Sequence, residues 1–251
     1  MKNSADSIRM ENLSYSVGGR RILENFDFSL ERGVNRTILG VSGSGKTTIL
    51  KLLLGLLLPE AGRVCIGDVC ITGIPESRFM EIRKRIAIVF QGGALFDSMT
   101  VGENVGYRLF EEGRLPQDEI EEIVREKLRF VGVEPALDLY PAELSGGMKK
   151  RVAIARALAA DPDYIFFDEP TTGLDPIGVY NICNLMQRLQ AEGKTTLMVT
   201  HDLATAFSTS QRFTFLHQAR MIFEGTEVEM RGSGIAEVRQ FLHPTVDSLF
   251  V

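Results

Sequence analysis

The stretch "GVSGSGKT" at residues 40–47 matches the pattern G-x-x-x-x-G-K-[S/T] without a mismatch. It follows the short apolar run "RTILG" (36–40) and precedes "KTTILKLLLGLLL" (46–58), a predicted helix that Pro59 stops. A strand, a glycine loop and a helix in this order direct backbone amides and a helix N-terminus at one anion. The sequence therefore predicts a phosphate-binding loop inside an α/β fold.

The residues of this loop have distinct predicted tasks. Gly40, Gly43 and Gly45 let the loop wrap with its amides pointing inward. Lys46 is expected to neutralise the β- and γ-phosphate oxygens of ATP, and Thr47 to bind Mg²⁺. The predicted ATP-binding residues of this segment are Gly40, Ser42, Gly43, Ser44, Gly45, Lys46, Thr47 and Thr48.

Strand and helix signals alternate along most of the chain. Predicted strands lie at residues 26–33, 36–40, 85–90, 164–170, 195–202, 212–217 and 220–225, with a hairpin at 62–73. Continuous apolar runs such as "YIFF" are typical of parallel sheets covered on both faces. Residues 92–158 show helices and loops only, including an amphipathic helix over 116–132. We therefore expect one α/β domain over 1–251, with a core at about 1–91 and 159–225, a helical subdomain at about 92–158 and a tail at 226–251.

Two carboxylates follow the apolar strand "YIFF". Asp168 ends the strand, where a carboxylate can hold Mg²⁺ directly or through water. Glu169 comes next and is expected to orient and deprotonate the attacking water. Taken alone, Glu169 fits a helix-capping or loop carboxylate better. Beside Asp168, and with a phosphate loop in the same chain, the general base is the favoured interpretation.

Polar residues end two further predicted strands. His201 follows "TTLMVT", on the edge of an open α/β sheet where ligands bind, and is expected to contact the γ-phosphate or the water. The alternative is a surface histidine that caps the helix "DLATAFS". Gln91 follows "RIAIVF" and is expected to contact Mg²⁺ or water, with an ordinary loop glutamine as the alternative.

A second helix start with anion-binding character lies in "AELSGGMKKRVAIARAL" (142–158). Ser145, Gly146 and Gly147 offer a hydroxyl and backbone amides just ahead of a helix. The stretch belongs to the predicted helical subdomain, so one molecule would struggle to bring it and the phosphate loop to the same phosphate. Two molecules head to tail would do so, which predicts a homodimer of C₂ symmetry with two ATP molecules at its interface.

Composition limits the class of protein. The net charge of −5 and pI near 5.4 argue against a general nucleic-acid binder, so no nucleic-acid partner is expected. Cys65, Cys70 and Cys183 show no metal-binding spacing, and reduced thiols are the favoured interpretation. The N-terminal "MKNSADSIRMENL" has no apolar core typical of a signal peptide. The apolar run "ILKLLLGLLL" is far shorter than the roughly 20 residues that span a bilayer, so no membrane crossing is expected.

The order of "GVSGSGKTT", Gln91, "LSGGM", "IFFDEP", "GLDP" and His201 resembles the ATP-binding subunits of ABC transporters, over about residues 8 to 225. The resemblance implies a P-loop NTPase core, made of a parallel sheet with an antiparallel β subdomain, plus a helical insert. It implies ATP and Mg²⁺ as cofactors, with Thr47, Gln91 and Asp168 around the metal, and an ATP-sandwich homodimer. Glu169 matches the catalytic base of the family, His201 its switch histidine, and Asp175 in "GLDP" its dimer contact.

The chain departs from the family pattern at two positions. Met148 stands where glutamine is usual in the signature. Val17 stands where an aromatic residue is expected to stack on adenine. Either Tyr15, two residues earlier, takes over this contact or adenine stacking is weak.

A finer resemblance is to the ATPases of Mla/Mce-type lipid transport. It rests on "VFQGGALFDSMTVGENV" (89–105), "ELSGGM" and "VRQFLHP" (238–244). It implies lipid, most of all phospholipid, as cargo, an integral membrane permease and an Mce-domain protein as partners, and a peripheral location on the cytoplasmic face of the inner membrane. The "GALF" stretch suits a loop that docks on a permease and equally one that plugs a hydrophobic groove.

Other functions remain open on the sequence alone. They are an ABC transporter ATPase for another substrate, a soluble ABC ATPase of the iron–sulfur assembly type, and a P-loop kinase or switch GTPase, which would not need "LSGG". The tail 226–251 fits a clasp on a partner ATPase as well as a segment packed on its own sheet.

Overall fold

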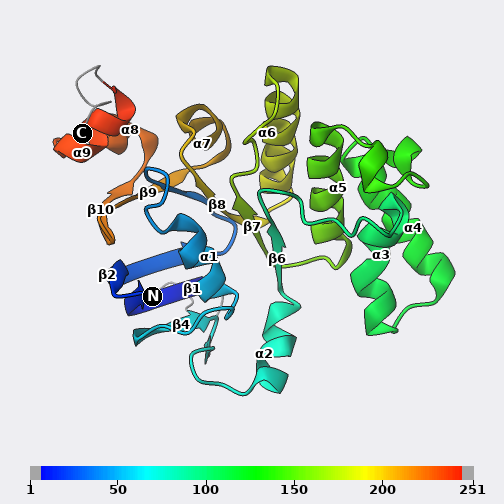
Figure 1. Ribbon diagram of the computed structural model, residues 1–251, viewed down its shortest axis with the longest axis horizontal. Helices are drawn as coiled ribbons and strands as arrows, with labels where there is room; N and C mark the ends of the chain where they lie inside the picture. Colours follow the sequence, from blue (N-terminus) through cyan, green and yellow to red (C-terminus); the bar gives the residue numbers. More distant parts are fainter. Residues whose placement is uncertain (1–6, 245–251) are drawn as a thin grey trace. The chain divides into compact units, whose positions relative to one another are not determined.

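The computed structural model describes residues 7–244 (Figure 1), and these fall into two compact units. The first unit comprises the described residues up to Arg83 together with those from Gln190 onward, and the second comprises Lys84–Leu189. The second unit contains two strands beside its helices, so the predicted boundary between a core and a helical subdomain stays a prediction.

The first unit contains an antiparallel sheet of order β2-β1-β4-β5 (Figure 1). Its strands are β1 (Ser7–Val17), β2 (Arg20–Glu31), β4 (Ala61–Ile66) and β5 (Val69–Cys70). The strand β1 lies between β2 and β4 and was not among the predicted strands. Its register shifts between Met10 and Leu13 and again near Tyr15, which breaks the alternation of apolar and polar residues by which a strand is recognised.

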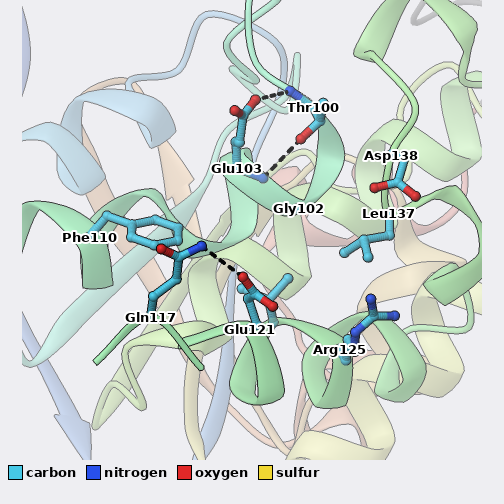
Figure 2. A pocket seen from close by; sticks show the side chains of 10 residues that line it. Thr100, Gly102, Glu103, Phe110, Gln117, Glu121, Arg125, Leu137 and Asp138 are labelled. Carbon is cyan, nitrogen blue, oxygen red and sulfur yellow. Dashed lines mark hydrogen bonds between the residues drawn. The ribbon is translucent and has the colours of Figure 1, made fainter. Parts of the chain in front are cut away.

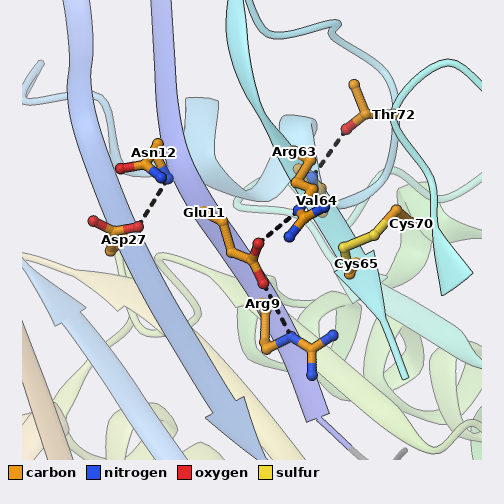
Figure 3. Close-up of polar contacts among 9 residues, drawn as sticks. All are labelled: Arg9, Glu11, Asn12, Asp27, Arg63, Val64, Cys65, Cys70 and Thr72. Atoms are coloured by element: carbon orange, nitrogen blue, oxygen red, sulfur yellow. Dashed lines mark hydrogen bonds and ion pairs between the residues drawn. A yellow bond between two sulfur atoms is a disulfide. The ribbon is translucent and has the colours of Figure 1, made fainter. Parts of the chain in front are cut away.

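The cysteines of the β4–β5 hairpin correct one expectation. Cys65 and Cys70 lie opposite each other across the hairpin and form a disulfide (Figure 3). Reduced thiols were expected, and that interpretation is wrong for this pair, while Cys183 is a buried free cysteine. A turn at Gly67 and Asp68 makes positions 65 and 70 cross-strand neighbours. The predicted hairpin therefore already implied that these two cysteines lie close enough to form a disulfide.

A second set of strands in the first unit is mostly parallel. Strand β3 (Asn35–Leu39) lies between β8 (Thr195–Thr200) and β9 (Arg212–His217), parallel to both, and β10 (Arg220–Gly225) is antiparallel to β9. All five residues of β3 are buried although Asn35, Arg36 and Thr37 are polar, and the Arg36 guanidinium pairs with Glu224 at 2.8 Å. The helices of this unit are α1 (Lys46–Leu53), α2 (Glu76–Arg83), α7 (Leu203–Thr209), α8 (Glu227–Arg231) and α9 (Ala236–Leu242).

Helix α1 is shorter than predicted. It ends at Leu53 because Gly55 takes a left-handed backbone conformation with φ of 62°. A Cβ on Gly55 would lie 2.3 Å from the ring of Phe79, so this turn admits only glycine. The apolar run therefore stops being helical before Pro59.

In the second unit, β6 (Ile86–Val89) and β7 (Tyr164–Asp168) pair in parallel. Between these two strands the described chain is helical: α3 (Val101–Glu112), α4 (Gln117–Phe130), α5 (Gly146–Ala159) and two short 3₁₀ turns, Glu134–Ala136 and Pro141–Glu143. Helix α6 (Pro176–Ala191) follows β7. The predicted amphipathic helix is confirmed as α4, with Ile120, Val124 and Leu128 buried. Within residues 7–244, no helix is long and apolar enough to cross a bilayer.

Candidate functional site

The glycine loop of the first unit has the geometry of an anion cradle. It connects the buried strand β3 to α1, and the N-cap residue Gly45 has φ of 104° with no side chain capping the helix. The first amides of α1 therefore point at the loop without an intrahelical partner. The buried Lys46 places its Nζ 2.8 Å from the carbonyl oxygen of Gly40 and 3.0 Å from that of Val41. This places the lysine ammonium inside the loop that is predicted to hold phosphate.

A hollow of about 360 Å³ lies against this loop. Its lining includes Val41, Ser42, Gly43 and Ser44 of the loop, Arg20, Arg21, Ile22 and Glu24 of β2, and His217, Gln218 and Ala219. Neither Tyr15 nor Val17 lines it. Val17 is 56% exposed and Tyr15 is half-buried in β1, where it pairs with Leu23. The role of Tyr15 in stacking on adenine stays a prediction.

In the second unit, the predicted signature residues begin α5. Ser145 is the N-cap, and its hydroxyl accepts a hydrogen bond from the amide of Met148 at 3.3 Å. A Cβ at Gly146 or Gly147 would meet no atom within 4 Å, so there is open space beside both residues. The helix start thus combines a hydroxyl, the first amides of a helix and the positive end of a helix dipole.

Asp175 lies on the same hollow as the signature residues. This hollow of about 360 Å³ is lined by Ser145, Gly146, Gly147, Arg151, Gly173, Leu174, Asp175, Ile177, Gly178 and Asn181. The Oδ1 atom of Asp175 accepts a hydrogen bond of 2.6 Å from the amide of Gly178. On α6, Ile177 and Tyr180 are 72% and 70% exposed. A candidate anion site beside exposed apolar side chains suits a surface that another molecule covers.

Asp168 and Glu169 lie in the second unit, at the end of β7 and just after it, where the sequence predicts them. Asp168 is the last residue of β7 and is buried. Glu169 follows with φ of 47°, a conformation uncommon outside glycine that is often found at functional sites. Its Oε2 atom accepts a hydrogen bond from Thr172 Oγ1 at 3.3 Å. Glu169 does not cap the helix that follows, because the carboxylate of Asp175 accepts the hydrogen bond from the Gly178 amide in the first turn of α6.

The structure also settles what begins α7. The carboxylate of Asp202 caps this helix, accepting a hydrogen bond from the amide of Ala204 at 3.0 Å and one from Thr205. His201 is exposed at the end of β8 and is not the cap. The capping alternative for His201 is therefore excluded, and its contact with phosphate or water stays a prediction.

One polar residue near the candidate site was missed on the sequence. Lys150 is buried in α5 and donates hydrogen bonds to the carbonyl oxygens of Gln91 and, at 3.4 Å, Glu169. Burial lowers the pKa of Lys150, and the charges of Asp168 and Glu169 oppose this shift. On the sequence it belongs to the basic run at 149–151, which looks like a solvated surface. The helical period of α5, which places Lys150 in phase with buried residues, was the available signal.

A further hollow in the second unit contains none of the predicted site residues (Figure 2). It measures about 520 Å³ and is lined by Thr100, Gly102, Glu103, Phe110, Gln117, Glu121, Val124, Arg125, Leu137 and Asp138. Figure 2 shows Thr100 and Glu103 bonded to each other as the cap of α3. Size alone therefore does not locate the chemistry in this protein.

The cradle around Lys46, followed by a helix without a side-chain cap, defines a P-loop nucleotide-binding protein. The sequence matches the family described as ABC transporter over residues 23–172. It is 40% identical to the intermembrane phospholipid transport system ATP-binding protein MlaF of Haemophilus influenzae, over 94% of this chain and 89% of that protein. It is 37% identical to MlaF of Escherichia coli strain K12, over 97% of this chain and 91% of that protein.

A solved structure supports the same assignment. The dimeric post-hydrolysis state of the ATP-binding cassette MJ0796, bound to ADP and phosphate, superposes with a TM-score of 0.80 at 32% identity, covering 87% of this chain and 98% of that one. The chain belongs to the ABC transporter family and is an ABC-type ATPase with the α/β fold of P-loop NTPases.

Proposed function

We propose that this chain is the ATP-hydrolysing subunit of an ABC transporter that moves phospholipids across or between membranes of the cell envelope. The observation that carries the proposal is the 40% identity to a phospholipid-transport ATPase along 94% of the chain. The loop segment 89–105 and the tail segment 238–244, which resemble lipid-transport ATPases, support it.

The chemistry proposed for ATP follows from the contacts in each unit. Lys46 donates hydrogen bonds to carbonyl oxygens of its own loop and would exchange them for the β- and γ-phosphate oxygens of ATP, whose negative charge it would offset. Glu169 would take a proton from the attacking water, whose oxygen bonds to the γ-phosphorus as the bond to ADP breaks. His201 would donate a hydrogen bond to the γ-phosphate, and Gln91 would orient the water.

The residues proposed around Mg²⁺ suit that ion. The three predicted ligands, the Thr47 hydroxyl, the Gln91 side chain and the buried carboxylate of Asp168, offer only oxygen donors, which Mg²⁺ prefers. Among residues 7–244 there is no cluster of three His, Cys, Asp or Glu side chains that could enclose a metal alone. Mg²⁺ is commonly bound by one or two protein carboxylates together with substrate phosphates and water. When bound, Mg²⁺ would offset negative charge on the phosphates.

We infer that two copies of the chain form the working ATPase. The hollow beside Ser145 and Asp175 would receive the γ-phosphate end of ATP held by the partner's loop, and the exposed Ile177 and Tyr180 would border that interface. The dimer would bind an integral membrane permease through the loop that begins at Gln91, with an Mce-domain protein as the further lipid-handling partner.

The proposed location is peripheral, on the cytoplasmic face of the inner membrane. The Cys65–Cys70 disulfide bears on this proposal, because reducing systems keep most cytoplasmic thiols unbonded. The pair is bonded in the structure, so thiol labelling in cells tests the proposed location: a chain on the cytoplasmic face would carry this pair mostly as thiols.

Affinity purification from membranes in mild detergent, followed by mass spectrometry of proteins and lipids, tests the proposal. A multi-span permease, an Mce-domain protein and phospholipid are expected to copurify. A permease with a small-solute binding protein would contradict the lipid cargo. Soluble partners alone would favour an ABC ATPase outside transport, of the iron–sulfur assembly type.

A further inference from the structure

Helix α5 holds the Gln91 loop through two cationic side chains, the buried Lys150 and the half-buried Arg156. Lys150 donates to the carbonyl oxygen of Gln91. Two turns further along the helix, Arg156 donates from Nη1 to the carbonyl of Ala94 at 2.8 Å and from Nη2 to that of Gly93 at 2.9 Å. The loop after β6 is therefore fastened at two points to the helix that begins at Ser145.

Lys150 also reaches the turn that carries the proposed base. Its second hydrogen bond, of 3.4 Å, goes to the carbonyl oxygen of Glu169. That residue has φ of 47°, so the direction of its carbonyl is set by an uncommon backbone conformation. One ammonium group thus joins three segments of the second unit: the end of β6, the turn after β7 and the first half of α5.

Burying the charged side chain of Lys150 costs desolvation free energy, and an apolar side chain could pack at this place without that cost. The side chain is 6% exposed, and burial lowers its pKa because desolvation disfavours the charged form. It donates hydrogen bonds to two neutral carbonyl oxygens, while Asp168 and Glu169 act on it through their charges. A methionine has a similar unbranched stem without this desolvation cost, so what the ammonium adds at this place is its charge and its hydrogen-bond donors.

We propose that Lys150 is a positioning residue for ATP hydrolysis, which holds the Gln91 loop and the Glu169 turn in register with the helix that begins at the signature residues. Occupation of the anion site at Ser145 is thereby linked, within one chain, to the placement of Gln91 and Glu169. Lys150 acts through these residues and does not touch ATP. The inference rests on the proposed role of Glu169 as the base.

The test compares Lys150→Met with Lys149→Met in the intact protein. Lys149 is the neighbouring residue on the same helix, and its replacement removes the same charge without removing these hydrogen bonds. For Lys150→Met we expect kcat to fall about 10- to 100-fold, the range for loss of a group that orients catalytic residues, with little change in KM for ATP. Lys149→Met is expected to keep the wild-type kcat, and Lys150→Arg to recover part of it, because a guanidinium restores charge and donors.

Folding is checked by thermal unfolding of each variant. If Lys150→Met fails to fold, Lys150→Gln takes its place, since its amide keeps two N–H donors without the charge, and a kcat between those of the wild type and Glu169→Gln is expected. Wild-type kcat in Lys150→Met or Lys150→Gln, or an equal loss in Lys149→Met, would overturn the inference. Failure of the base assignment looks different, because Glu169→Gln would then turn over ATP normally.

Discussion

Replacing Ser145 by arginine tests whether the second anion site serves ATP held by the partner molecule. The side chain is exposed at the start of α5, and the hollow beside it has room for a longer one, since Gly146 and Gly147 have no neighbours near their Cα hydrogens. Arginine would fill the space into which the phosphate end of ATP is proposed to enter.

The structural cost of this change is small. It removes the cap bond to Met148, which at 3.3 Å is long, so about 0.5–1 kcal/mol of helix stability is lost. A domain with a stability of about 5–15 kcal/mol remains folded after such a loss. The catalytic cost is expected to be larger, about 100- to 1,000-fold in kcat, because a preorganised donor set to the transferring phosphate is blocked. ATP binding to the isolated chain, which depends on the Lys46 loop, should be largely intact.

Mixing experiments then distinguish a site shared between molecules from a site within one. Ser145→Arg and Lys46→Ala should each be inactive as homodimers. A mixed dimer would contain one intact composite site, so an equal mixture is expected to regain about a quarter of wild-type activity if the sites turn over independently. The matched control has the same overall composition: the Ser145→Arg/Lys46→Ala double variant mixed with wild type.

In this control, mixed dimers would lack any intact shared site, and about a quarter of wild-type activity, from wild-type homodimers, would remain. A site within one molecule predicts instead no activity in the first mixture and about half in the control. That second pattern, or normal turnover by Ser145→Arg alone, would refute the reasoning.

Three further experiments, two substitutions and one labelling measurement, test other parts of the account. Glu169→Gln should bind ATP, accumulate as a closed dimer on gel filtration and lose about 100- to 10,000-fold in hydrolysis, whereas normal turnover would disprove the base assignment. Gly40→Ala should lower the unfolding free energy by about 1–3 kcal/mol, because its Cβ would lie 2.6 Å from a carbonyl oxygen and 2.7 Å from a hydroxyl. Gly92→Ala, which meets nothing within 4 Å, is the control, and equal thermal stability of the two variants would contradict the packing argument. Alkylation in denaturant of cells quenched with acid should label Cys65, which is buried in the folded chain, and Cys70 if the chain faces the cytoplasm, and resistance of both to labelling until a reductant is added would argue against that location.

Part of the fold was predictable because some strands, such as β7 and β8, are fully buried and contain an apolar run. The apolar run of β7 and the glycine loop before α1 can each be recognised from a few consecutive residues. Strand β1 was missed because register shifts interrupt its alternation, and α1 was drawn too long because the left-handed turn at Gly55 is a tertiary feature set against Phe79. Contacts between residues far apart in the sequence cannot be predicted from the pattern of neighbouring residues.

In the candidate site, too, single residues were predictable from local sequence, whereas their contacts with distant segments were not. Asp175 and the signature residues were predicted separately, and the structure brings them to one hollow. Lys150 was missed because three segments distant in sequence define its role, and a basic run is typical of a solvated surface. The capping of α7 by Asp202 rather than His201 likewise depends on hydrogen bonds that spacing does not determine.

The most direct test of the central claim is ATP-dependent phospholipid movement by the purified complex in liposomes, followed with a fluorescent phospholipid. The account predicts transfer that requires ATP and is abolished by Glu169→Gln, while a water-soluble solute is not moved. ATP hydrolysis without any phospholipid transfer, in a complex that moves a small solute instead, would contradict it.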